Sequence, residues 1–195
     1  MEQAINMSNQ PTSVQINLDK CLMTPYTVHD PRHVSDLKAQ FYDQVAAQKL
    51  IDQGDPLVYE IYHHAFITDA TDMAMGMSVI HPGKVGCEYH MTKGHLHARN
   101  DQAEVYYCVR GQGLLLMDDM ADDFQAVDFN CGTAVHIPPQ YAHRVVNTGS
   151  DILVFVSVFH VAAGHVYAQV TKQGFARLVV EVKGKTTLID NPKRE

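Results

Sequence analysis

The sequence lacks the features that mark nucleic-acid-binding, membrane-spanning and disulfide-stabilised proteins. It carries a net charge of −7 over 195 residues, and no basic run is longer than Lys193-Arg194, which argues against a nucleic-acid partner. No stretch approaches the roughly 18 apolar residues of a membrane-spanning helix. The four cysteines are widely spaced without a Cys-x-x-Cys pair, and a chain of this length does not depend on disulfide bonds to fold.

The composition is that of a soluble globular domain. Hydrophobic residues make up 46% of the chain and charged residues 19%, enough for a core under an ordinary polar surface. The first residues, Met1 to Lys20, do not have the basic start and apolar stretch of a signal peptide. We therefore expect a cytoplasmic protein with reduced thiols, built as one structural domain.

One helix is expected near the N-terminus, after a polar arm. Asp30-Pro31 has the pattern of a helix start, with Asp as the cap, and Gly54-Asp55-Pro56 has that of a helix stop. Between them apolar residues recur near helical spacing, at Val34, Leu37, Phe41, Val45 and Leu50. This pattern predicts a helix over about residues 31–53, whose Phe41 and Val45 contact the core. Residues 1–54 are then an arm and a helix that pack on the remainder.

Residues 55–195 have the pattern of a β-barrel or β-sandwich. Short apolar segments alternate with turns that contain Gly and Pro, as in all-β domains. An interior of this kind can hold a small ligand. We predict strands at residues 57–62, 73–80, 88–91, 104–109, 113–117, 124–128, 133–137, 142–147, 152–158, 168–171, 178–182 and 186–190.

The predicted strands carry a group of side chains that bind metals. His95 and His97 are two residues apart, so on a strand they point to the same face. Glu104 opens the next strand, and His143 lies in the segment 132–143. Imidazole and carboxylate together suit a divalent ion such as iron(II), manganese, nickel or zinc. The sequence therefore predicts a metal site inside the barrel.

The same segments resemble the motifs of the cupin superfamily. The likeness to its two motifs rests on Glu104-x6-Gly111 and on Gly132-x5-Pro138 with His143 and Asn147. Within the superfamily, the chain resembles the cupin-type phosphoglucose isomerases, which share the spacing of six residues between His97 and Glu104. That likeness covers about residues 55–192 and includes Pro82-Gly83-Lys84-Val85-Gly86, Thr92-Lys93-Gly94-His95-Leu96-His97, Ala142-His143-Arg144, Ala163-Gly164-His165 and Asp190-Asn191-Pro192.

The resemblance implies a mainly β cupin fold, that is, a double-stranded β-helix or jelly-roll barrel at residues 55–195, and a homodimer. It also implies a phosphosugar substrate and one divalent metal ion per subunit, iron(II) before manganese, nickel or zinc. The implied metal ligands are His95, His97, Glu104 and His143. The implied substrate-contacting residues are Ser78, Thr92, Gly94, Tyr106, His165 and Tyr167. A tyrosine of the family is replaced by Phe159, which removes a hydroxyl donor.

The implied activity is the metal-dependent interconversion of glucose 6-phosphate and fructose 6-phosphate, an aldose–ketose isomerisation of glycolysis and gluconeogenesis. We expect Glu104 to move a proton between C1 and C2 through a cis-enediol, and His165 to assist ring opening or proton transfer between oxygens. A hydride shift between the two carbons is the competing route. Two other functions use the same ligands: an iron-dependent cupin dioxygenase, and a cupin that binds sugar phosphates without turnover.

Residues beside the expected ligands are expected to point away from the site. Lys93 and Arg144 each adjoin the ligand segments, and regular strands turn both toward solvent. His160 follows Phe159 and faces the opposite side of its strand. The remaining histidines are expected on the surface or in the core: His29, His33, His63, His64, His81, His90 and His136.

Overall fold

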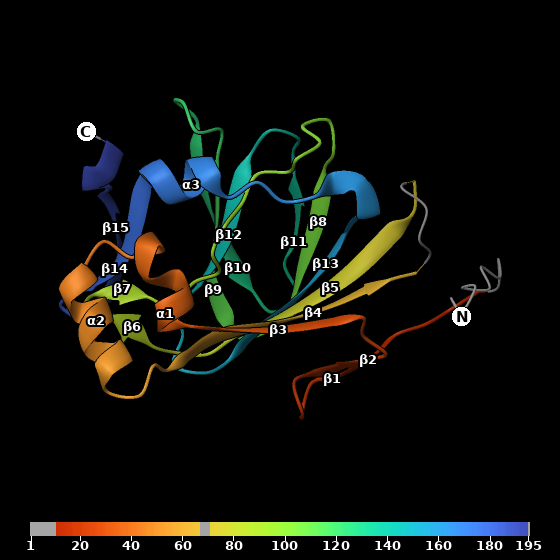
Figure 1. Cartoon of the computed structure of the whole chain (residues 1–195), viewed down its shortest axis with the longest axis horizontal. Helices are drawn as coiled ribbons and strands as arrows, with labels where there is room; N and C mark the ends of the chain where they lie inside the picture. Colours follow the sequence, from red (N-terminus) through yellow and green to blue (C-terminus); the bar gives the residue numbers. More distant parts are fainter. Residues whose placement is uncertain (1–10, 67–70, 195) are drawn as a thin grey trace, which may run out of the picture.

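The structure, a computed structural model, describes residues 11–66 and 71–194 (Figure 1). Its largest element is an antiparallel sheet of six strands in the order β11-β8-β13-β5-β4-β3. This sheet forms one wall of the barrel and supplies most of the site described below. Its strands are β3 (Val28–His33), β4 (Leu57–Ala65), β5 (Met73–Ile80), β8 (Glu104–Arg110), β11 (Ala134–Ile137) and β13 (Leu153–His160).

A second layer of strands shares a core with this sheet. Two sheets form it, in the orders β10-β9-β12 and β15-β14-β7-β6. The bridges Met91–Val146 and His95–His143 tie the segment after β7 to β12, so the two sheets are continuous. Their strands are β6 (Lys84–Val85), β7 (Glu88–Tyr89), β9 (Gln112–Asp118), β10 (Phe124–Asn130), β12 (Ala142–Asn147), β14 (Arg177–Val182) and β15 (Lys185–Asp190).

The main hydrophobic cluster lies between the two layers. It includes Cys108 of β8 and Leu153 of β13 from the first layer, and Leu115 of β9 and Val145 of β12 from the second, all fully buried. Burial of such side chains on both layers is the main force that closes the barrel. The predicted mainly β jelly-roll barrel is thereby confirmed.

The N-terminal segment covers the other face of the six-stranded sheet. Strands β1 (Gln15–Asn17) and β2 (Leu22–Thr24) form a hairpin, which carries the fully buried Met23. Met23 belongs to a smaller core cluster with side chains of β4, β5 and β13, among them Tyr62, Met77 and Val154. The arm is therefore packed on the barrel.

The prediction of one helix over residues 31–53 is wrong. Pro31 lies in β3, an edge strand, where a residue without an N–H is tolerated. The helical part is split into α1 (Val34–Leu37), the 3₁₀ turn η1 (Lys38–Gln40) and α2 (Gln44–Asp52). Asp43 caps α2 by accepting a hydrogen bond from the Ala46 N–H at 2.8 Å. Phe41 is buried as predicted, whereas Val45 is 82% exposed because the break turns it outward.

One predicted strand, residues 168–171, is also wrong: this segment belongs to the helix α3 (Ala168–Gln173), which Gly174 ends with a φ of 69°. Four residues are too few for apolar spacing to separate a strand from a helical turn, and only Val170 of the helix is buried. The other predicted strands are present, with ends shifted by a few residues.

The short 3₁₀ turns η2 (Val161–Ala163) and η3 (Pro192–Arg194) complete the described elements. None of the helices in the described residues has the length and apolar character to cross a membrane.

Candidate functional site

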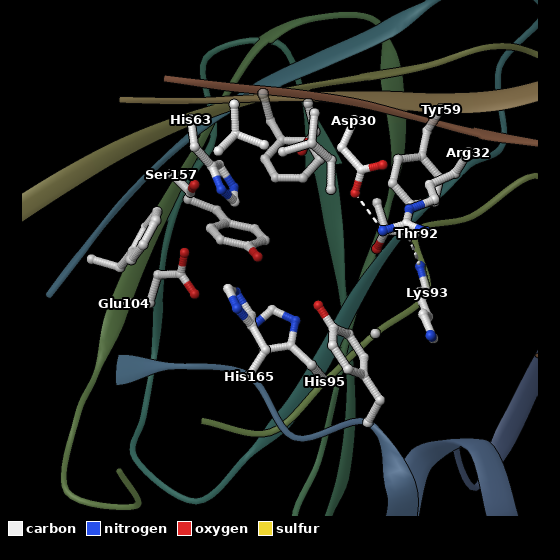
Figure 2. Close-up of a pocket in the computed structure, with 18 residues that line it drawn as sticks. Asp30, Arg32, Tyr59, His63, Thr92, Lys93, His95, Glu104, Ser157 and His165 are labelled. Carbon is white, nitrogen blue, oxygen red and sulfur yellow. Dashed lines mark hydrogen bonds and ion pairs between the residues drawn. The ribbon is translucent and has the colours of Figure 1, made fainter. Parts of the chain in front are cut away.

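A cavity of about 210 Å³ lies against the inner face of the six-stranded sheet (Figure 2). Strands β3, β4, β8 and β13 contribute alternate residues to it, as the two-residue period of a strand requires, and β5 contributes Ser78. The opposite wall is formed by residues 92–95 and by His165 and Tyr167. Backbone hydrogen bonds between Leu96 and Val166, of 3.0 and 2.8 Å, hold these two segments together.

The four predicted metal ligands meet at one end of this cavity. One ligand atom from each of His95, His97, Glu104 and His143 lies within 4.8 Å of all the others. Oε2 of Glu104 is 3.1 Å from Nε2 of His97 and 3.2 Å from Nε2 of His143. The rings of His95 and His143 are perpendicular neighbours, with centroids 4.3 Å apart. The bridge between the backbones of these two residues fixes that arrangement.

Carbonyl groups fix which nitrogen of two imidazoles faces the cluster. Nδ1 of His97 donates to the Gln102 carbonyl at 2.9 Å, and Nδ1 of His143 donates to the Tyr141 carbonyl at 3.1 Å. When the rings are neutral, each Nε2 therefore presents a lone pair toward the Glu104 carboxylate. Buried lone pairs that face one another are costly unless a proton or a metal ion lies among them.

The remaining donors of the cluster also fit a divalent ion. Within the described residues, Nε2 of His95 and of His143 are buried without a hydrogen-bond partner, and such atoms are costly unless they bind something. Three imidazoles and one carboxylate form a donor set of borderline softness, which iron, manganese, nickel and zinc all accept. The residues present therefore fit a metal ion, although they do not select one element.

The protonation states of the cluster follow from burial and from its own contacts. Burial, together with the neighbouring imidazoles, lowers the pKa of His95 well below its ordinary value, so this ring is neutral and able to bind a metal. Burial by itself raises the pKa of Glu104, but the imidazoles of His143 and His97 lower it on balance. The carboxylate is therefore ionised at neutral pH. Burial opposes protonation of His97, yet the Glu104 carboxylate raises its pKa overall.

Gly94 and Arg144 shape the backbone that presents His95. Gly94 has a φ of 75°, and a Cβ there would lie 2.8 Å from Cε2 of Phe175. Arg144 lies under this bend, donates to the Lys93 carbonyl at 2.6 Å and stacks on Phe175 with 4.5 Å to the ring centroid. The prediction that Arg144 faces solvent is wrong, since it is 3% exposed. Alternation along β12 holds, but the side of the strand that carries Arg144 is covered by Phe175 and by the backbone at Lys93 instead of by solvent.

The other end of the cavity carries positive charge. Arg32 of β3 forms an ion pair with Asp30 beside the cavity. Lys93 also lies at this end rather than away from the site, and its ammonium is 4.4 Å from the Tyr167 ring centroid. The Tyr59 hydroxyl accepts a hydrogen bond from the Lys93 N–H at 3.3 Å, and burial raises the pKa of Tyr59 to about 12. Arg32 and Lys93 exceed Asp30 by one positive charge, and together with neutral hydroxyls they form a setting that suits an anion.

All of the predicted substrate-contacting residues line the cavity. They are Ser78, Thr92, Gly94, Tyr106, His165 and Tyr167. Burial raises the pKa of Tyr106 well above its ordinary value, so the phenol stays protonated. The ring of His165 is perpendicular to that of His95, with centroids 4.2 Å apart. Burial and the neighbouring His63 lower the pKa of His165 to about 4, so its imidazole is neutral at pH 7.

Sequence reasoning missed Asp30, Arg32, Tyr59, His63 and Ser157, all of which line the cavity. A signal for two of them was present, because Tyr59, Ile61 and His63 share one face of β4 by the period of two. Phe159 lines the cavity, whereas its neighbour His160 is not among the lining residues. His64 turns to the opposite side of β4 from His63, toward Phe66, as expected for adjacent strand residues.

Two of the solved structures similar to this chain are enzymes that act on oxalate. The oxalate decarboxylase of Bacillus subtilis at pH 4.6 matches 56% of this chain and 27% of its own, with a TM-score of 0.46 and 18% identity. An oxalate oxidase in complex with glycolate matches 52% of this chain and 49% of its own, with a TM-score of 0.43 and 19% identity.

Sequence relatives are more similar. The glucose-6-phosphate isomerase of Thermococcus litoralis is 40% identical over 162 residues, which are 83% of this chain and 85% of the relative. That of Pyrococcus furiosus is 37% identical over 83% of this chain and 86% of its own. Residues 31–193 match the model of the family described as glucose-6-phosphate isomerase (GPI). On this match and these identities, the chain belongs to the glucose-6-phosphate isomerase family, in its cupin form.

Proposed function

We propose that this protein is a metal-dependent aldose–ketose isomerase that interconverts glucose 6-phosphate and fructose 6-phosphate, a step of glycolysis and gluconeogenesis. The observation that carries the proposal is the division of the cavity: a His/Glu cluster lies at one end, and at the other Arg32 and Lys93 exceed Asp30 by one positive charge. A hexose phosphate has the matching division, with its reacting carbons at one end and its phosphate at the other. The named relatives support the same substrate.

His95, His97, Glu104 and His143 would hold one divalent ion, for which we propose iron(II), with manganese, nickel or zinc as alternatives. When bound, such an ion polarises the C1 and C2 oxygens as a Lewis acid and lowers the cost of negative charge on them. The His/Glu end thus binds the part of the sugar whose hydrogen must move.

Glu104 is the proposed base, acting through a cis-enediol. Its Oε2 faces two imidazoles, whereas Oε1 has no such contact among the described residues. One oxygen can therefore remain in the cluster while the other takes the proton from C2 and returns it to C1. His165, neutral at pH 7 and aimed into the cavity, is placed to pass a proton between sugar oxygens or to assist ring opening.

The phosphate is proposed to bind at the end that carries Arg32 and Lys93. Thr92, Gly94, Ser78 and Tyr167 line the cavity there or beside it and offer hydroxyl and backbone donors. Arginine, lysine and such donors are the usual partners of phosphate oxygens. This end would orient the sugar so that C1 and C2 reach Glu104.

A cytoplasmic homodimer is the proposed assembly. Its support is an apolar strip on the outer face of β8 and β13, where Val105, Tyr107 and Val158 are 43%, 42% and 38% exposed. Val105 pairs directly with Val158 across the two strands, so the strip is continuous. Light scattering on a Tyr107→Glu variant would report monomers if this strip is the interface.

The experiment that tests the function is fructose 6-phosphate isomerisation by the purified protein. Turnover is measured as isolated, after chelation, and after adding back iron(II), manganese, nickel or zinc singly. We expect chelation to abolish turnover and one or more of these ions to restore it. If the metal-loaded protein shows no turnover, the proposal fails, and oxygen uptake would then distinguish a dioxygenase from a protein that only binds sugar phosphates.

A further inference from the structure

His63 faces the cavity from β4, on the wall opposite His165 (Figure 2). The two rings are nearly parallel, with planes 6° apart and centroids separated by 6.3 Å. The edge-to-face contact of His63 with Phe159, at 5.6 Å between centroids, fixes the ring against this wall. His63 is not in the metal-ligand group, so its place in the cavity is not explained by the cluster.

Strand register puts His63 in a polar row that crosses the sheet. His63 pairs with Gly76, Gly76 with Ser157, and Ser157 with Tyr106. His63, Ser157 and Tyr106 therefore face the cavity side by side. Glu104 lies two residues before Tyr106 on β8, one step along the strands. The polar row is thus the next layer of the wall after the Glu104 carboxylate.

Gly76 makes room for this row. A Cβ at Gly76 would lie 2.6 Å from Oγ of Ser157, closer than real side chains allow, and 3.1 Å from Cδ2 of His63, which is a tight contact. Both side chains therefore lean over the same glycine from the strands on either side. The absence of a side chain at Gly76 is therefore what allows His63 and Ser157 to lie against the cavity wall, since any larger residue there would displace them.

We propose that His63, with Ser157 beside it, forms hydrogen bonds with the hydroxyl groups on C3 or C4 of the sugar phosphate and so selects among substrates. This inference rests on the proposed function, because Glu104 is taken to face C1 and C2. His63 and Ser157, one step further along the strands, then face C3 and C4. Among the described residues the His63 ring makes no hydrogen bond, and burial lowers its pKa, so the neutral ring has one donor and one acceptor for hydroxyl groups.

The test compares His63→Ala, His63→Gln and Ser157→Ala with wild type on fructose 6-phosphate and on its 3-deoxy and 4-deoxy analogues. His64→Ala is the matched control, since it is the neighbouring histidine on the opposite face of the same strand. We expect His63→Ala to lower kcat/KM about tenfold, the usual size of one hydrogen bond at a closed site. His63→Gln should retain part of the kcat/KM that His63→Ala loses, and His64→Ala should have the kcat/KM of wild type.

The deoxy analogues separate contact with substrate from a structural role. If His63 contacts the missing hydroxyl, wild type loses about tenfold on one analogue while His63→Ala loses nothing further on that analogue. Equal additional losses in both proteins, or a His63→Ala variant with wild-type kinetics, would overturn the assignment.

Binding of glucitol 6-phosphate, which has the C3 and C4 hydroxyls but cannot isomerise, keeps this test independent of turnover. Calorimetry should give His63→Ala a Kd about tenfold above that of wild type and of His64→Ala. Equal Kd values would overturn the role of His63 whatever the activity. Normal binding by wild type without turnover would overturn the proposed function but leave the role of His63 standing.

Discussion

The two ends of the cavity are built in different ways. At the His/Glu end the side chains of His97, Glu104 and His143 are 5%, 4% and 0% exposed, and backbone carbonyls orient the imidazoles. At the other end Arg32 has a side chain 36% exposed, and its ion pair with Asp30 is formed without a metal or substrate. One end is fixed by packing, while the other consists of long side chains that can adjust.

This difference assigns the proton transfer to the His/Glu end and phosphate recognition to the charged end. A proton transfer demands placement within a fraction of an ångström, which buried, hydrogen-bonded groups supply. A dianionic phosphate is recognised mainly by charge, which tolerates movement and solvent. Substitutions at the buried end should therefore reduce kcat and metal content, whereas substitutions at the charged end should raise KM.

The largest effect is expected for His143→Ala. The change removes one ligand and leaves Glu104 with one fewer partner in a buried site, so metal content should fall below one ion per chain. Turnover should drop by about three orders of magnitude, the several kcal/mol that a bound metal contributes. Metal analysis and isomerase kinetics measure both, with the exposed His136→Ala as control. A variant that binds and turns over normally would remove His143 from the centre.

A smaller effect on KM is expected for Arg32→Ala. Loss of one guanidinium should raise KM for fructose 6-phosphate about tenfold with kcat nearly unchanged, since a hydrogen bond to a charged group contributes roughly 1.5–3 kcal/mol. The control is Arg99→Ala, another arginine paired with a nearby aspartate but fully outside the cavity. A decrease in kcat alone would contradict the assignment of Arg32 to phosphate binding.

Gly94→Ala should reduce stability by more than Gly184→Ala. Both glycines have nearly the same φ, 75° and 74°, but only at Gly94 would a Cβ meet other side chains. The backbone strain of about 1 kcal/mol is thus common to both, and the excess at Gly94 measures the contact with Phe175 and Arg144. Thermal unfolding measures the loss of stability in each variant. Equal losses would show that Phe175 and Arg144 move aside at little cost.

The smallest effect concerns Glu60, on the outer face of β4 away from the cavity. Burial alone raises its pKa, but hydrogen bonds with His29 and His81 lower it on balance. A carboxyl whose pKa is lowered on folding stabilises the native state above its unfolded pKa of about 4.3, and this contribution is lost as pH falls through the folded value. Wild type should therefore lose stability relative to Glu60→Gln below about pH 4.5, with turnover at pH 7 equal in both. An unchanged difference between the two proteins at all pH values would contradict this.

The residues that form the barrel and the metal cluster could be predicted because they obey a local rule. His95, His97, Glu104 and His143 lie in extended segments where the period of two and the residue types are informative. The helix of residues 31–53 could not be placed, since the pairing of β3 with β4 outweighs a Pro signal that is locally ambiguous.

The charged end was missed for a related reason. Arg32 reaches the cavity only because β3 joins the edge of the sheet, a contact between distant parts of the chain. Arg144 was placed in solvent because the contacts that cover its side of β12, with Phe175 and the Lys93 carbonyl, come from distant parts of the chain. The two-residue period of β4 does place His63 on the same face as Tyr59 and Ile61, so the sequence contained a signal that His63 faces the cavity.

The most direct test of the account is the turnover of Glu104→Gln in a metal-loaded state. Glutamine keeps the shape and one oxygen for the cluster but cannot accept the C2 proton. We expect a metal content near that of wild type, unchanged binding of glucitol 6-phosphate, and isomerisation lowered by about three orders of magnitude. Near-normal turnover with the metal bound would contradict it, because the hydrogen would then move without this carboxylate.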